Sequence, residues 1–175
     1  MGARADSIDL AQVAPAAGDG RRLELNVAPG RLSYGDQEYG VEGGAAAARV
    51  DVSRTMHGYA LRLRFAADVA GPCVRCLEHA AAHVEVDARE VEQADAGGSE
   101  DDLHSPYVDG DELDLSAWAH DALALAMPGK FLCRRDCAGL CPVCGESLND
   151  ADPTEHRHAS QPDPRWAKLR ELKLD

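Results

Sequence analysis

Six cysteines in two clusters constrain the fold of this 175-residue chain more than any other feature. Four of them lie within residues 133–145, and the other two lie within residues 73–76. The six positions are Cys73, Cys76, Cys133, Cys137, Cys141 and Cys144. A Cys-x-x-Cys on a tight turn lets two thiolates converge on one metal ion. The fold therefore has to bring distant segments together around these thiols.

The charge and the cysteine usage narrow the class of protein. The chain carries 18 basic and 31 acidic residues, a formal net charge of −13, which disfavours broad binding to nucleic-acid phosphates or anionic membranes. Neither a secretion signal nor a run of about 18 apolar residues is found. We therefore expect a cytoplasmic, soluble protein without membrane contact, in which paired cysteines serve as metal ligands rather than disulfides.

Alternation of apolar and polar residues predicts antiparallel strands. Residues 23–27 and 50–52 have this period, with a Gly-rich loop between them through residues 43–44, and residues 59–69 and 83–91 show it most clearly. The last two segments form a hairpin whose connection carries the first Cys-x-x-Cys. A turn at a hairpin tip is a rigid way to present two ligands.

One central helix is expected to lead into the second cysteine cluster. Asp114 is a suitable N-cap for a helix through Met127, followed by a Pro-Gly stop. Trp118 and Leu125 lie on its apolar side, and Trp118 is interpreted as a core anchor. The acidic region 85–114 is either a solvated face with a loop or a docking site for a basic partner.

These elements predict an α+β protein, mainly an antiparallel sheet or partial barrel, with one central helix and a C-terminal cysteine-rich segment that binds zinc. Residues 1–20 are expected to be a flexible tail with at most one short docked segment. Residues 21–160 form a single domain that includes the zinc-binding segment 133–158. Residues 161–175 are expected to be a short basic helix that begins at an Asp-Pro pair.

Eight side chains have the chemistry of zinc ligands, the number required for two closed tetrahedral sites. They are the six cysteines together with His156 and His158. One partition joins the hairpin pair to Cys133 and Cys137, and leaves Cys141 and Cys144 with the two histidines. The other joins the two Cys-x-x-Cys pairs around one ion, as in a zinc ribbon. We prefer the first partition because it leaves no thiol unused, and expect one or two structural zinc ions.

Nothing in the sequence indicates an enzyme, so no catalytic or small-molecule site is assigned. A dithiol oxidoreductase would place its Cys-x-x-Cys at the start of an apolar helix beside a βαβ pattern, and neither pair has that setting. A metal-dependent hydrolase would need an open coordination position with a general base beside the ligands. A zinc-ribbon adaptor of an unrelated complex and, less favoured, a thiol oxidoreductase or metallohydrolase are the alternatives.

Several motifs together resemble the YceD family, the large ribosomal RNA subunit accumulation proteins. They are Cys-Val-Arg-Cys-Leu-Glu at 73–78, the helix ending Leu-Ala-Met-Pro at 125–128, Cys-x3-Cys-Ala-Gly-Leu-Cys-Pro-x-Cys-Gly at 133–145, Leu-Asn at 148–149 and Asp-Pro-Arg-Trp-Ala at 163–167. Where many relatives have a final Cys-x-Cys, this chain has His156 and His158, which preserves ligand chemistry. Family members that lack most of these cysteines exist, so zinc is not the core of the shared function.

The resemblance implies a non-catalytic bacterial factor in the synthesis, processing or accumulation of large-subunit ribosomal RNA. The implied partner is a precursor of the large ribosomal subunit. We expect a basic ribosomal protein as the direct contact because the chain is acidic. Direct RNA contact stays open, since Arg134, Arg135 and the basic C-terminal residues could form a local patch.

Overall fold

The computed structural model describes residues 5–93, 103–152, 156 and 158. Its elements, in chain order, are β1 (Ser7–Asp9), α1 (Leu10–Val13), β2 (Gly20–Val27), β3 (Arg31–Tyr34), β4 (Gln37–Val41), β5 (Ala46–Arg54), β6 (Gly58–Pro72), β7 (His79–Gln93), β8 (Val108–Asp109), β9 (Glu112–Asp114) and α2 (Leu115–Ala126). The expectation of an α+β protein dominated by antiparallel strands is confirmed.

Six strands form one open antiparallel sheet in which β2, β5, β6 and β7 are successive neighbours. The β3–β4 hairpin joins the same edge of β6 as β5 but farther along, since β5 pairs with residues 59–65 and β4 with residues 69–70. The described strands do not close into a barrel. A second, three-stranded sheet has the order β1-β9-β8.

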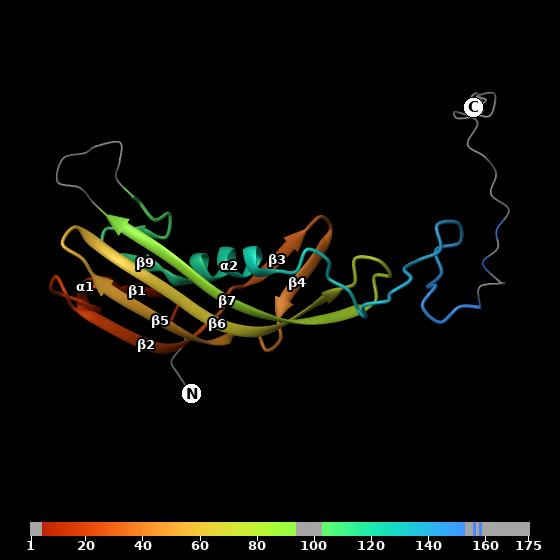
Figure 1. Cartoon of the computed structure of the whole chain (residues 1–175), viewed down its shortest axis with the longest axis horizontal. Helices are drawn as coiled ribbons and strands as arrows, with labels where there is room; N and C mark the ends of the chain where they lie inside the picture. Colours follow the sequence, from red (N-terminus) through yellow and green to blue (C-terminus); the bar gives the residue numbers. More distant parts are fainter. Residues whose placement is uncertain (1–4, 94–102, 153–155, 157, 159–175) are drawn as a thin grey trace, which may run out of the picture.

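The predicted hairpin is the longest feature of the molecule. β6 and β7 have 15 residues each and pair along their whole length, from Gly58 with Gln93 to Pro72 with His79. At the usual rise of a strand this ribbon is about 50 Å long. It carries the Cys73–Cys76 turn away from the helix-covered half of the sheet, to the end where the cysteine-rich segment lies (Figure 1).

The core lies between one face of the sheet and α2. Alternate residues of the strands are buried, among them Val50, Leu63 and Val86, and they belong to one apolar cluster with Trp118 and Leu123 of α2. Trp118 is 1% exposed, so its interpretation as a core anchor is confirmed. The apolar face of the strands, which has a period of two residues, therefore packs on the apolar face of α2, which has the helical period, in a single interface.

α2 begins where the sequence predicts, because the Asp114 carboxylate accepts a hydrogen bond from the Ala117 N–H at 2.9 Å. The prediction for Leu125 was wrong, since this side chain is 88% exposed. The buried positions run 115, 118, 119, 122 and 123, and their continuation falls at 126 rather than 125. The single central helix is not confirmed either, because the described residues contain α1 as well as α2.

One segment differs from the loop expected there. Residues 31–41, placed in a Gly-rich loop, form the β3–β4 hairpin, whose turn has Gly35 at φ 61°. In the expected tail, the short docked segment that was allowed for lies at residues 7–14, where β1 pairs with β9 and Ile8, Leu10 and Ala14 are buried. The short basic helix expected over 161–175 lies outside the described residues.

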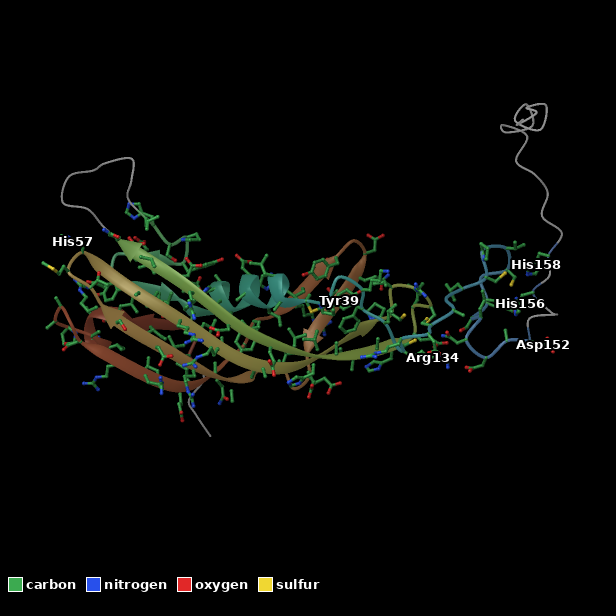
Figure 2. The ribbon with its side chains drawn as sticks, in the orientation of Figure 1. Tyr39, His57, Arg134, Asp152, His156 and His158 are labelled. Atoms are coloured by element: carbon green, nitrogen blue, oxygen red, sulfur yellow. The ribbon has the colours of Figure 1, made fainter. Side chains whose placement is uncertain are left out.

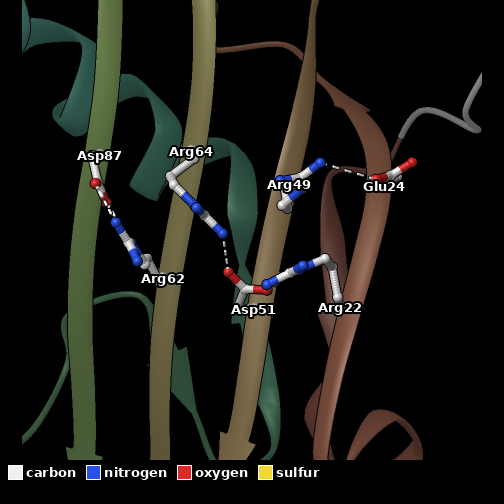
Figure 3. Close-up of polar contacts among 7 residues, drawn as sticks. All are labelled: Arg22, Glu24, Arg49, Asp51, Arg62, Arg64 and Asp87. Atoms are coloured by element: carbon white, nitrogen blue, oxygen red, sulfur yellow. Dashed lines mark hydrogen bonds and ion pairs between the residues drawn. The ribbon is translucent and has the colours of Figure 1, made fainter.

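The face of the sheet opposite α2 is covered by charged side chains (Figure 3). Asp51 accepts from both Arg22 and Arg64, Arg62 pairs with Asp87, and Arg49 pairs with Glu24. Positively and negatively charged side chains therefore alternate across β2, β5, β6 and β7, and each of these arginines is paired with a carboxylate.

None of the helices in the described part of the chain has the length and apolar character needed to cross a bilayer.

Candidate metal centre

The first Cys-x-x-Cys turn is shaped by its backbone. The Leu77 N–H donates to the Cys73 carbonyl at 2.9 Å, and the Cys73 N–H donates to the Glu78 carbonyl at 2.7 Å. Leu77 has φ 62°, the left-handed conformation, and is the one non-glycine residue with positive φ in the described chain. This tight reversal points both thiols to the same side.

The second Cys-x-x-Cys turn repeats these bonds in the cysteine-rich segment. The Gly145 N–H donates to the Cys141 carbonyl at 2.9 Å, and the Cys141 N–H donates to the Glu146 carbonyl at 2.7 Å. Gly145, with φ 76°, occupies the position of Leu77. A glutamate follows in both turns, and its carboxylate lies 3.7 Å from the Cys76 Sγ in one and 3.9 Å from the Cys144 Sγ in the other.

Four thiols form the first candidate metal group, at the tip of the β6–β7 hairpin. The Sγ atoms of Cys73 and Cys137 are 3.7 Å apart, those of Cys76 and Cys133 are 3.5 Å apart, and all four lie within 4.8 Å of one another. A tetrahedral zinc with Zn–S bonds of 2.3 Å places its sulfurs about 3.8 Å apart. A disulfide would require about 2.05 Å. The donor set and its spacing thus fit a tetrahedral metal site.

An aromatic contact and two hydrogen bonds hold the cysteine-rich segment against the hairpin tip. Phe131, 3% exposed, meets the ring of Tyr39 edge-on, with centroids 5.0 Å apart. The Val74 N–H donates to the Phe131 carbonyl at 2.9 Å, and the Arg75 guanidinium donates to the Cys137 carbonyl at 2.7 Å. These contacts bring Cys133 and Cys137 opposite the first turn.

The second candidate group joins Cys141 and Cys144 to His156 and His158, with all four ligand atoms within 4.8 Å. The Cys144 Sγ lies 3.5 Å from the His156 Nδ1, close to the roughly 3.5 Å expected between sulfur and nitrogen ligands of one tetrahedral zinc. The group lies at the end of the molecule opposite His57 (Figure 2). Cys144 is exposed whereas Cys73, Cys76 and Cys137 are buried, so this group is the more accessible one.

The thiols of each group are unequal in acidity. Burial raises the pKa of Cys73, but N–H groups led by that of Arg75 donate toward the sulfur and lower its pKa to about 6. Burial and the neighbouring thiols raise the pKa of Cys133 to about 12. In the second group, the N–H groups of Cys144 and Val143 lower the pKa of Cys141 to about 6. In each group, one cysteine therefore loses its proton readily. A bound cation is needed before the other cysteines do so, because it offsets the repulsion between neighbouring thiolates.

The structure groups Cys73 and Cys76 with Cys133 and Cys137, which is the preferred partition of the predicted ligands. It does not bring the two Cys-x-x-Cys turns together around one point, which a zinc ribbon would require. Metal binding by the eight residues stays a prediction. Glu78 and Glu146, beside the thiols, were not singled out from the sequence. The shared Cys-x-x-Cys-x-Glu spacing was the signal that could have identified them.

Fold and site together define a class: an antiparallel-sheet α+β protein with two separate Cys/His groups, each of which could hold a metal ion. The family model of the large ribosomal RNA subunit accumulation protein YceD matches residues 61–173. The chain therefore belongs to the YceD family, whose description names accumulation of the large ribosomal RNA subunit.

Relatives are found in mycobacteria. Uncharacterized proteins of Mycobacterium bovis and Mycobacterium tuberculosis are each 40% identical to the chain over 111 residues, which is 61% of this chain and 52% of theirs. One of Mycobacterium leprae is 38% identical over 104 residues, covering 57% of this chain and 46% of its own. The chain thus aligns with about half the length of these relatives. No solved structure matches it.

Proposed function

We propose that this protein is a non-catalytic zinc-binding factor that supports accumulation and processing of large-subunit ribosomal RNA through binding, in the bacterial cytoplasm. The observation that carries the proposal is the match of residues 61–173 to the YceD family. The two Cys/His groups supply its zinc component. A reducing compartment suits such sites, because oxidation of the thiols would remove the ligands.

The donor sets favour a structural role for the zinc. Each group offers four protein ligands, the number that closes a tetrahedral site, whereas a catalytic zinc keeps one position for water. In this role Cys73, Cys76, Cys133 and Cys137 would fasten the cysteine-rich segment to the hairpin tip. Cys141, Cys144, His156 and His158 would fold the segment beyond it, where few apolar side chains are buried.

A basic protein of the large-subunit precursor is the direct partner that the charge distribution favours. The chain has a net charge of −13, and the arginines of the outer sheet face are paired with Asp51, Asp87 and Glu24. Paired guanidinium groups offer less to a phosphate backbone than free ones do. The net negative charge of the whole chain would attract a positively charged ribosomal protein.

Co-sedimentation with ribosomal particles tests the proposal. The tagged protein is expected in fractions that contain large-subunit precursors. Cells that lack the protein are expected to contain a smaller amount of mature large-subunit RNA. A Cys76→Ser variant, which lacks a ligand of the first group, should rescue the loss poorly. Met56→Ser in the β5–β6 turn serves as the control, since Met56 is 85% exposed. Absence of the protein from all precursor fractions, with normal ribosomal RNA in its absence, would favour an adaptor of an unrelated complex.

A further inference from the structure

We propose that the groove between α2 and the free edge of β7 binds an extended, basic peptide segment by strand addition. The groove has a volume of about 420 Å³. It is lined by the consecutive residues 85–90 of β7 and, across from them, by Trp118, Ala122, Leu125 and Ala126 of α2, with Tyr107 beside them. The identity of the partner, a basic ribosomal protein, rests on the proposed function. The binding of a basic peptide in the groove does not.

Six consecutive residues of β7 line the groove, although successive side chains of a strand point to opposite faces. The groove therefore runs along the edge of the strand. β6 occupies the other edge of β7, and on the groove side the described residues contribute only a bridge between Gln93 and Leu103. Alternate backbone N–H and C=O groups of residues 85–90 are thus available to a further strand.

Leu125 supplies the apolar contact that such a strand would find. Its side chain is 88% exposed at the groove, although the other large apolar residues of α2, Leu115, Trp118 and Leu123, are buried. A strand paired with β7 would direct every second side chain toward Leu125, Ala122 and Ala126. Burial of these apolar surfaces would add to the main-chain hydrogen bonds, as in other complexes formed by strand addition.

The charged residues around the groove indicate which kind of peptide would bind there. Among the residues of β7 that line the groove, Glu85 and Asp87 lie on the exposed face with Arg89, and Asp87 is already paired with Arg62. Glu90 lies on the opposite face of β7, and Asp121 of α2 accepts a hydrogen bond from Tyr107. The lining of β7 therefore has three acidic residues and one basic residue. A second copy of β7 would bring another net negative charge to this lining. Lysine or arginine on the side of the added strand that faces Glu85 would instead be attracted. The groove therefore fits a segment that alternates apolar and basic residues.

A synthetic peptide of about eight residues with alternating Lys and Val or Leu is the probe. Its affinity is measured by fluorescence anisotropy at two salt concentrations, and protected amides are located by hydrogen exchange. We expect binding to the wild-type chain with protection within residues 85–90. Leu125→Arg should weaken binding about tenfold or more, whereas Met56→Arg, the same change at a residue 85% exposed in the β5–β6 turn, should have no effect. Circular dichroism checks that both variants fold.

Three results with the peptide would overturn the proposal: equal binding of a peptide of the same composition with its lysines in one block, equal binding to Leu125→Arg, or protection confined to other strands. A fourth would be a dimer in sedimentation equilibrium that Leu125→Arg dissociates, because the groove would then bind a second copy. If Leu125→Arg loses the peptide but still co-sediments with precursor particles, the groove is not the site of the ribosomal partner. If the peptide results hold while the wild-type chain does not co-sediment, the proposed function fails and the groove stands.

Discussion

Gly71 near the end of β6 allows the aromatic contact that holds the cysteine-rich segment. A Cβ at this position would lie 2.3 Å from the Tyr39 Cδ1 and 2.8 Å from its Cε1, where contacts of 3.4–4 Å are ordinary. Tyr39 is 4% exposed and meets Phe131 edge-on, two residues before Cys133. The ring therefore has little free space into which it could move. Gly71→Ala should displace it and disturb the approach of Phe131.

The expected cost is that of an overpacked core, about 1–3 kcal/mol, or roughly 5- to 150-fold in the folding equilibrium. Urea unfolding of the metal-loaded protein measures it as a lower midpoint with an unchanged slope. Gly20→Ala in β2 is the matched control. A Cβ there would lie 3.9 Å from its nearest neighbours, so this variant should be as stable as the wild type or slightly more stable.

A double-mutant cycle identifies the cause. In a Tyr39→Ala background the ring is gone, and Gly71→Ala should cost little. An equal cost of Gly71→Ala in both backgrounds would refute the reasoning, because the strain would then arise in the strand itself and not at the aromatic contact.

Three further predictions concern the turns, the outer face and metal removal. Leu77→Gly should raise the free energy of unfolding by up to about 1 kcal/mol in urea unfolding, because glycine adopts the φ of 62° without strain and Leu77 is 57% exposed. Hydrogen bonds from Arg22 and Arg64 outweigh burial and keep the pKa of Asp51 below its usual value, so their stabilisation is present at neutral pH and lost as the pH falls through that lowered pKa. Asp51→Asn should cost about 1 kcal/mol at pH 7 and nothing in strong acid, and a cost that persists in acid would contradict the assignment. Chelation should make residues 133–152 sensitive to protease while residues 20–93 stay protected, and equal loss of both would show that the sheet depends on metal.

The long hairpin and the helix could be predicted because each buries one face along its whole length. The period of two in β6 and β7 and the helical period after Asp114 are therefore visible in the residues themselves. The β3–β4 hairpin was missed because its strands are short and its Gly35-Asp36 turn has the composition of a loop. The exposure of Leu125 follows from the exact position of the buried stripe on α2, which continues at residue 126 rather than 125.

The choice between the two ligand partitions also required the three-dimensional structure. The spacing of the cysteines indicated the candidate ligands but allowed either Cys133 and Cys137 or Cys141 and Cys144 to face the hairpin tip. Packing of Phe131 on Tyr39 brings the former pair there. The shared Cys-x-x-Cys-x-Glu spacing could have drawn attention to Glu78 and Glu146, and the structure adds that the two turns have equivalent backbone hydrogen bonds.

We propose that the four-cysteine group and the Cys/His group each hold one zinc ion. Native mass spectrometry of protein purified under reducing conditions, with and without chelator, tests it most directly. We predict two zinc ions per chain for the wild type and one for either Cys76→Ser or His156→Ala, with all metal lost after exhaustive chelation. A wild type without metal would contradict the account, as would a single zinc that His156→Ala leaves in place.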